Sequence, residues 1–385
     1  MAIDRRSARC AALLLLVCAC AAARAVSAVS DGPLSNGNFE CPPDRSQMNG
    51  SVVTGEYALP SWKLSGQVEY ICSGQMQGDM LLTVPEGAHA VRLGNDASIQ
   101  QQISVTPGTY YSVTLTAART CAQSEKLRVT ASPGQSVDLP IQTVYSSSGW
   151  DSYSWAFKAV CVQASIVIHN PGQEDDPGCG PIIDSVSIKT LNPAQSTQYN
   201  LLKNGDFEEG PYISQEYYQS GVLLPPIGEN NVSPLPGWTI MSYSKVVKYI
   251  DSAHFSVPRG GRAVELVSGV ETALVQDVDT VPGSTYRVEF SAGDAADGCD
   301  ASGSPMQVQA YAAEGRTVVP VDSQGTGGYK RASFEFTATE TRTRVVFVSL
   351  GYNTRSDGSG TLCGPVIDDV SLVCASQPPA RKLLL

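Results

Sequence analysis

The chain has 385 residues, a length that suits two domains better than one. Charged residues make up only 16% of it, whereas glycine (35 residues) and proline (24 residues) are abundant, a mixture that favours short strands and frequent turns. The net charge of −11 at pH 7 opposes binding to nucleic acid, so that class of partner is excluded.

Residues 1–28 have the features of a secretory signal peptide. Three arginines precede an apolar run over residues 11–23, and small residues suited to cleavage follow it. The run is shorter than the ~20 residues that a membrane-spanning helix needs, so we expect secretion without a membrane anchor. In the secreted chain Asn49 lies in a glycosylation sequon, and Asn231 lies in a second one that Pro234 weakens.

Sequence motifs recur in the same order in the two halves of the chain. NGNFE at 36–40 returns as NGDFE at 204–208, and CGPIID at 179–184 returns as CGPVID at 363–368. Two copies of this length are typical of tandem domains, since solenoid repeats are shorter. The duplication divides the chain into the signal peptide 1–28, a first domain 29–190, a polar linker 191–198, a second domain 199–376 and a disordered tail 377–385.

Within each copy, apolar residues alternate with polar ones. Val113 and Leu115 alternate with serine and threonine, and Phe334 and Phe336 alternate with polar residues in the second copy. An alternation with period two, interrupted by turn residues, is typical of antiparallel strands. We therefore predict an all-β fold of two tandem antiparallel β-sandwiches of the jelly-roll type.

Removal of the signal peptide leaves eight cysteines, an even number that suggests disulfides in a secreted chain. Four of them occupy matching places in the two copies, which selects one bridge in each copy. The other four have no counterparts, and their pairing gives one bridge within the first copy and one between the copies. The predicted bridges are Cys121–Cys179, Cys299–Cys363, Cys41–Cys72 and Cys161–Cys374.

Each copy also places two carboxylates where a cation could bind. Glu40 and Glu208 follow the opening Asn-Gly turns, and Asp184 and Asp368 stand at the edge of the apolar face of the final strand. First and last strands are often neighbours in a closed sandwich, so each pair could join loop carbonyls around a structural Ca²⁺, which takes about six to eight oxygens. In the alternative interpretation these carboxylates accept backbone N–H bonds and bind nothing.

Aromatic residues that occur in only one copy are the candidate ligand-binding residues, because the shared fold does not require them. Catalysis is not expected, since the chain has three histidines and lacks the sequence patterns of zinc proteases, α/β-hydrolases and nucleotide-binding enzymes. The candidates are Trp150, Tyr153 and Trp155 in the first copy and Tyr243, Tyr329 and Tyr352 in the second.

Several of these segments resemble a known family. VPEGAHAVRLGNDASI (84–99), HNPGQEDDPGCGPIIDSVSIKTL (169–191), GGYKRASFEF (327–336) and LCGPVIDDVSL (362–372) look like the plant cell-wall proteins of the domain-of-unknown-function 642 family. The resemblance covers nearly the whole secreted chain. It implies two galactose-binding-like domains, similar to carbohydrate-binding modules, in a protein of the apoplast and cell wall. It also supports the two predicted calcium sites.

Two functions are therefore expected as alternatives. In the first, a non-enzymatic protein binds wall polysaccharide of the cellulose or pectin type. In the second, the domains dock onto a wall enzyme such as pectin methylesterase and modulate it. Direct sugar binding requires exposed coplanar aromatic rings, whereas docking onto an enzyme requires a broad patch with charged residues at its rim.

Overall fold

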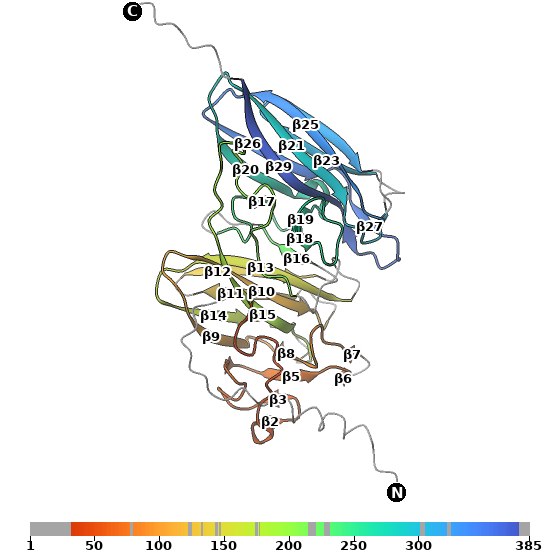
Figure 1. The fold of residues 1–385 in the computed structure, drawn as a ribbon. Coiled ribbons are helices and arrows are strands. Elements are labelled where there is room, and N and C mark those ends of the chain that lie inside the picture. Colours follow the sequence, from red (N-terminus) through yellow and green to blue (C-terminus); the bar gives the residue numbers. More distant parts are fainter. Residues whose placement is uncertain are drawn as a thin grey trace, which may run out of the picture.

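The structure is a computed structural model in which two β-sandwiches are stacked end to end (Figure 1). Among the residues that it describes, no helix has the length and hydrophobicity needed to cross a membrane. The described residues are 32–77, 80–121, 125–131, 134–142, 145, 148–173, 176, 178–214, 221–226, 232–300, 305–321 and 325–376.

The first sandwich has two antiparallel layers of five strands. One layer has the order β5-β8-β15-β10-β13, and the facing layer has the order β12-β11-β14-β9-β4. The strands are β4 (Lys63–Ser65), β5 (Val68–Cys72), β8 (His89–Leu93), β9 (Ser98–Ser104), β10 (Tyr110–Ala118), β11 (Glu125–Ala131), β12 (Gln135–Ile141), β13 (Trp150–Lys158), β14 (Gln163–His169) and β15 (Ile182–Leu191).

The second sandwich repeats this topology strand for strand. Its layers have the orders β18-β19-β29-β21-β25 and β17-β20-β26-β23-β24. The strands are β17 (Thr239–Met241), β18 (Val247–Asp251), β19 (Arg262–Glu265), β20 (Ala273–Asp279), β21 (Thr285–Asp294), β23 (Met306–Ala312), β24 (Gly315–Val321), β25 (Tyr329–Thr337), β26 (Arg342–Ser349) and β29 (Pro365–Ser376). The predicted all-β class and the two antiparallel sandwiches are confirmed.

Short strands and 3₁₀ turns lie at the edges and ends of the sandwiches. They are β1 (Gly32–Pro33), the 3₁₀ turn η2 (Arg45–Gln47), β2 (Met48–Asn49), β3 (Val52–Val53), β6 (Gln75–Gln77), β7 (Met80–Leu82), the 3₁₀ turn η3 (Gly269–Glu271), β22 (Cys299–Asp300), β27 (Asn353–Arg355) and β28 (Leu362–Cys363).

The repeated NG-x-F motif forms the same turn in both copies. A Cβ on Gly37 would lie 2.0 Å from the carbonyl oxygen of Val186, and one on Gly205 would lie 2.0 Å from that of Val370, so only glycine fits at either place. The indole of Trp62 donates to the Asn36 carbonyl at 2.9 Å, which ties this turn to the core. The motif is therefore repeated because it closes the end of each sandwich.

The linker 191–198 is not the only connection between the two sandwiches. A short strand of the second copy, β16 (Val222–Leu224), pairs in parallel with β13 and antiparallel with β18. One sheet of 14 strands therefore runs through both sandwiches. Leu223 is fully buried in the core of the first sandwich although it belongs to the second copy, so the cores are joined by packing as well as by the sheet.

Candidate functional site

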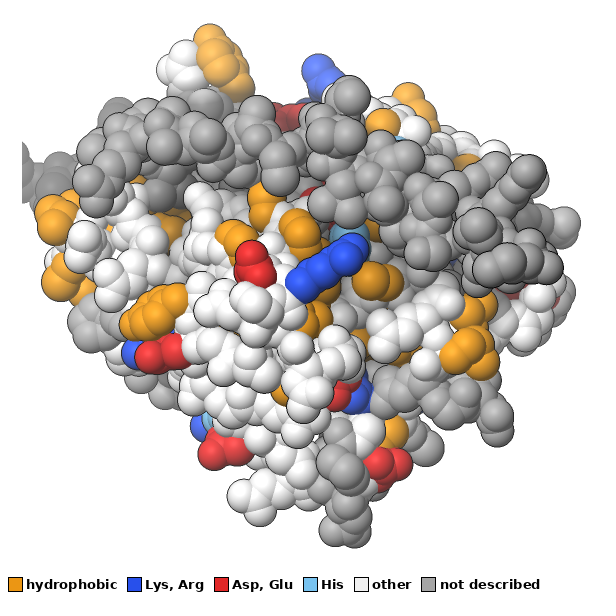
Figure 2. Space-filling model, turned by 90° about the horizontal axis from the view of Figure 1, so that it is seen from below, with side chains coloured by type: hydrophobic (Ala, Val, Ile, Leu, Met, Phe, Trp, Pro, Cys, Tyr) orange, Lys and Arg blue, Asp and Glu red, His pale blue; other side chains and the backbone are white. Residues whose placement is uncertain are grey.

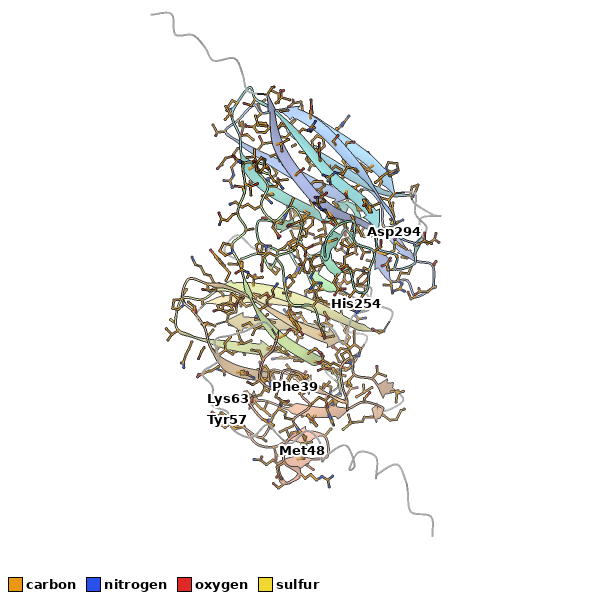
Figure 3. All side chains as sticks on the ribbon, viewed as in Figure 1. Phe39, Met48, Tyr57, Lys63, His254 and Asp294 are labelled. Atoms are coloured by element: carbon orange, nitrogen blue, oxygen red, sulfur yellow. A yellow bond between two sulfur atoms is a disulfide. The ribbon has the colours of Figure 1, made fainter. Side chains whose placement is uncertain are left out.

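The carboxylate that follows the opening turn binds backbone amides in both copies. Oε1 of Glu40 accepts the N–H of Ala88 at 2.6 Å and that of His89 at 2.8 Å, and its Oε2 lies 2.9 Å from Nδ1 of His89. Phe39, directly before Glu40, is buried inside the first sandwich (Figure 3). In the second copy, Oε1 of Glu208 accepts the N–H of Gly261 at 2.6 Å. Each carboxylate thus closes the loop that leads into a strand.

The late aspartate of each copy lies at a β-bulge in the last strand. Asp184 is fully buried, and its two oxygens accept the N–H of Ser185 at 2.6 Å and that of Glu86 at 3.3 Å. Burial, together with the charges of Glu86 and Glu40, raises the pKa of Asp184 well above its ordinary value. Burial likewise raises the pKa of Asp368 to about 7. A buried carboxylate of this kind is destabilised as an anion unless a cation approaches it.

The two copies differ beside this aspartate. The first copy has Glu86, which accepts the hydroxyl of Ser185 at 2.7 Å. The corresponding residue of the second copy is Arg259, whose guanidinium lies 3.1 Å from Asp369. The first copy therefore gathers three carboxylates and the second copy supplies a positive charge of its own.

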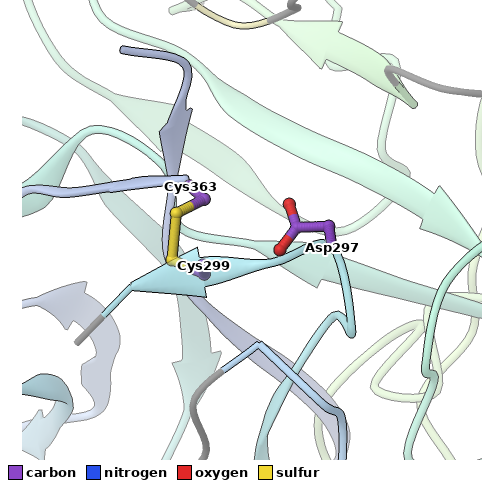
Figure 4. Close-up of side chains that lie close together, drawn as sticks. All are labelled: Asp297, Cys299 and Cys363. Atoms are coloured by element: carbon purple, nitrogen blue, oxygen red, sulfur yellow. A yellow bond between two sulfur atoms is a disulfide. The ribbon is translucent and has the colours of Figure 1, made fainter. Parts of the chain in front are cut away.

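Calcium binding stays a prediction for both carboxylate pairs. Among the described residues, the one group of three His, Cys, Asp or Glu side chains whose ligand atoms all lie within 4.8 Å is Asp297, Cys299 and Cys363. The two sulfur atoms of this group form a disulfide (Figure 4), so they are not metal ligands. Asp297 instead lies 3.6 Å from the ammonium of Lys248.

The candidate aromatic residues of β13 are not available to a ligand. Trp150, Tyr153 and Trp155 are 4%, 1% and 3% exposed. Tyr153 and Trp155 belong to the core of the first sandwich, and the indole of Trp150 donates to the Thr83 carbonyl at 3.0 Å. The prediction of a ligand platform here is wrong, because Tyr153 and Trp155 face the core of the first sandwich and Trp150 packs in a second buried cluster of the same copy.

Two of the three candidate tyrosines of the second copy belong to one exposed cluster. The hydroxyl of Tyr352 donates to the carboxylate of Glu271, and the ammonium of Lys245 lies 3.5 Å from the same carboxylate. Tyr243, two residues before Lys245, is completely exposed, and Val270 is 63% exposed. We call Tyr243, Lys245, Val270, Glu271 and Tyr352 the tyrosine cluster.

The ring of Tyr352 has a fixed position in this cluster. It lies over the backbone of Gly269, where a Cβ would come within 2.9 Å of the ring carbons. Its hydrogen bond lowers the pKa of Glu271, which therefore stays ionised. The sequence carried no signal for Glu271, because it lies in the 3₁₀ turn η3 rather than in a patterned strand.

Tyr329, the remaining candidate, lies on a different face. It begins β25, is 60% exposed, and pairs with Gly293 of β21. Arg331, two residues further along the strand, donates to the Asp369 carbonyl at 2.9 Å and lies 3.6 Å from Glu289. This face is a ladder of paired charges with one tyrosine at its end.

The two disulfides predicted from the repeat, Cys121–Cys179 and Cys299–Cys363, are present. The other two predicted bridges are not formed, because Cys72, Cys161 and Cys374 are thiols. Cys72 pairs across the β5–β8 ladder with His89. Cys374 lies near the end of β29, and this strand finishes at the end of the second sandwich that is farther from the first (Figure 1).

The glycosylation and processing predictions fall partly outside the described residues. Asn49 is described, and its side chain is exposed. Asn231, the signal peptide 1–28 and the tail 377–385 lie outside the described residues.

Comparison with solved structures gives weak similarity. The N-terminal tandem of two CBM22 domains from a Paenibacillus barcinonensis protein aligns with 92% of this chain and all of its own, at 11% identity and a TM-score of 0.28. The ANX1 ectodomain of Arabidopsis thaliana aligns with 80% of this chain and 88% of its own, at 9% identity and a TM-score of 0.28.

Comparison of sequences gives much higher similarity. The profile of the family described as "Protein of unknown function (DUF642)" matches residues 32–189 and 200–373. The protein DUF642 L-GALACTONO-1,4-LACTONE-RESPONSIVE GENE 2 of Arabidopsis thaliana is 52% identical over 95% of this chain and 97% of the relative. The protein DUF642 L-GALACTONO-1,4-LACTONE-RESPONSIVE GENE 1 of the same plant is 54% identical over 91% of this chain and 93% of the relative. Protein TEEBE of the same plant is 45% identical over 90% of this chain and 92% of the relative. The chain therefore belongs to the DUF642 family.

Proposed function

We propose that this chain is a secreted, non-enzymatic protein of the plant cell wall that binds wall polysaccharide, of the cellulose or pectin type. The observation that carries the proposal is the tyrosine cluster, in which an exposed ring of fixed orientation adjoins a carboxylate and an ammonium group. The family resemblance and the two disulfides agree with an extracellular location.

The tyrosine cluster has the chemistry that sugar rings need. A pyranose presents C–H groups on its faces and hydroxyls at its rim, so it stacks on an aromatic ring while its hydroxyls bond to charged or polar groups. One face of the Tyr352 ring rests on Gly269, and the side chain is 42% exposed. Because Glu271 and Lys245 already fix one another and the tyrosine, little side-chain entropy is lost when a sugar binds.

The histidines favour a non-enzymatic role. His89 lies 2.9 Å from Glu40, His169 lies 2.8 Å from Asp96, and His254 lies 2.7 Å from Asp251. Each of these contacts joins a histidine to a carboxylate of the same turn or of a neighbouring loop or strand. Each histidine therefore has a structural role that explains its presence.

Glycan binding by the purified mature chain tests this function directly. We expect binding to at least one cellulose-type or pectin-type glycan on an array. The Tyr352→Ala variant should bind it about two- to tenfold more weakly, because stacking contacts of an aromatic ring are worth roughly 0.5–1.5 kcal/mol. Tyr199→Ala, at a position that is 77% exposed and outside the cluster, is the matched control. Silence across all wall glycans rejects the proposal.

Docking onto a wall enzyme such as pectin methylesterase is the second candidate function. The ladder of paired charges on β21, β25 and β29 favours it, since charges of both signs are typical of the rim of a protein interface. On the end of the molecule seen in Figure 2, the coloured hydrophobic side chains are scattered rather than gathered in one patch. Capture of pectin methylesterase by the purified chain, lost on Arg331→Ala without loss of glycan binding, separates the two functions.

A structural Ca²⁺ in the first copy is part of the proposal. Glu40, Glu86 and Asp184 would be its side-chain ligands, and the raised pKa of the buried Asp184 shows how strongly that site resists an unpartnered negative charge. In the second copy, Glu208 and Asp368 are the corresponding residues, with Arg259 beside them. We therefore expect the first copy to hold calcium more tightly than the second.

A further inference from the structure

A depression lies on the outer face of the second sandwich, and Met241 in its lining is two residues before Tyr243 of the tyrosine cluster. Its volume is about 250 Å³, and it lies over strands β17, β20 and β26. Three cationic side chains and one carboxylate line it, together with Met241 and Val275. The charged residues are Lys203, Arg342, Arg344 and Asp277.

The carboxylate orients the two guanidinium groups. Asp277 accepts Nε of Arg344 at 2.8 Å and its Nη2 at 3.2 Å, and Nη2 of Arg342 lies 3.6 Å away. These arginines hold the pKa of Asp277 below its ordinary value, so it stays charged. Arg342 and Arg344 are nevertheless 69% and 53% exposed, which leaves donor groups free to face a ligand. The depression therefore has an excess of positive charge on a chain whose net charge is −11.

Lys203 is fixed by its backbone rather than by an acidic partner. The side chain of Gln276 accepts the N–H of Lys203 at 2.7 Å and donates to its carbonyl at 2.9 Å. A Cβ on Gly237 would come within 2.9 Å of the Lys203 Cβ, so the glycine lets the lysine backbone approach. The third cation is thus held at the rim by a scaffold that does not neutralise it.

The first sandwich has the same scaffold with different charges, because Lys63, which pairs with Glu56 at 3.1 Å, stands where the second copy has Thr239. Gln101 binds the backbone of Ser35 in the way that Gln276 binds Lys203, with distances of 3.1 and 2.9 Å. The ladder pairs Gln102 with Ser165, where the second copy pairs Asp277 with Arg344. Folding therefore does not require the two arginines or Asp277, because the first copy forms the same strands without them.

We propose that this depression binds the carboxylate groups of a polysaccharide of uronic acid units. The proposal rests on the proposed glycan binding and names the chemical class of glycan. Arginine presents a planar fork of donors that matches a carboxylate, and the lysine at the rim adds a third positive charge. The exposed thioether of Met241 gives the apolar surface on which a sugar ring can rest.

Unesterified polygalacturonate and its fully methyl-esterified form are the probes, because esterification removes the negative charge of each carboxylate and leaves the sugar backbone unchanged. We expect the mature chain to bind the free acid at least about tenfold more tightly than the ester. Its affinity for the free acid should fall as the salt concentration rises. The double variant Arg342→Gln, Arg344→Ser takes the residues of the first copy and should lose this preference. Arg128→Gln is the matched control, since Arg128 forms the same kind of exposed pair with Asp138, at 2.7 Å.

The outcomes separate this inference from the proposed function. Equal binding of acid and ester, or a preference that survives in the double variant, overturns the inference even where glycan binding itself persists. Failure to bind any glycan overturns both. If thermal melting shows that the double variant is unfolded, Lys203→Ser replaces it, and the preference for the free acid should again fall.

Discussion

Replacement of the buried Asp151 by asparagine should stabilise the protein, and by more at neutral than at acid pH. Asp151, in β13, is completely buried, and neither of its oxygens has a hydrogen-bond partner among the described residues. Burial raises its pKa from 3.8 to about 8, an effect that the charge of Lys248 only partly offsets. The native state therefore keeps this carboxyl protonated at pH values where the unfolded chain has ionised it.

The magnitude follows from the difference between the two pKa values. Below about pH 4 Asp151 is protonated in both the native and the unfolded state and does not change the free energy of unfolding. From there to about pH 8 unfolding releases a proton, so the free energy of unfolding falls by about 1.4 kcal/mol per pH unit. The penalty is thus about 1 kcal/mol at pH 4.5 and about 4 kcal/mol at pH 7. Because asparagine does not ionise, Asp151→Asn should gain stability over the native protein by these amounts.

Urea unfolding of both proteins at several pH values between 4.5 and 7 is the assay. The burial of Glu265 raises its pKa to about 7, and the raised pKa values of Asp184 and Asp368 act on stability in the same direction. The difference between variant and native protein isolates Asp151 from that background. Asp138→Asn, at an exposed paired carboxylate, is the control. Parallel stability curves, or an Asp151→Asn variant that is less stable at pH 7, would refute the reasoning.

Two further predictions concern the junction and the cation. Leu223→Ala should lower the free energy of unfolding by about 2–5 kcal/mol, since Leu223 completes the core of the first sandwich from the second copy. Both sandwiches should still unfold in one transition. Two separated urea transitions in the unmodified chain contradict this. Calcium should raise the melting temperature of the mature chain relative to chelator. Glu86→Arg should reduce this rise, because it gives the first copy the charge that the second copy has. Identical melting of the unmodified chain with and without chelator rejects the site.

Repetition made the scaffold predictable from the sequence. A residue that recurs at the same place in both copies is constrained twice by the same backbone geometry, as Gly37 and Gly205 are by the carbonyl that faces each of them. The same reasoning identified both disulfides, because Cys121–Cys179 and Cys299–Cys363 connect matching strand ends. Pairs without a counterpart had no such constraint, and those predictions failed at Cys72 and Cys374.

The burial of β13 was not predictable from its own pattern. In β11 the alternation holds, with Leu127 and Val129 buried and Lys126 and Arg128 exposed, because one face of that strand meets water. In β13, eight successive residues are buried, since β16 extends the sheet and the second copy covers the outer face. A strand of three residues with a partner about 70 positions away leaves no periodic signal that a single sequence can reveal.

The divergence between the copies is the strongest guide to function. Both copies retain the glutamine that holds a backbone at the sheet surface, and both retain the tryptophan beneath it. The side chains that project outward from the same strands have changed from amides and hydroxyls to arginine and aspartate. Stability does not explain this change, because exposed ion pairs contribute about 0–1 kcal/mol and the first copy folds in the same way without these arginines and this aspartate. A change that the fold does not need, in the lining of a surface depression, is the pattern expected when two copies of one scaffold come to bind different ligands.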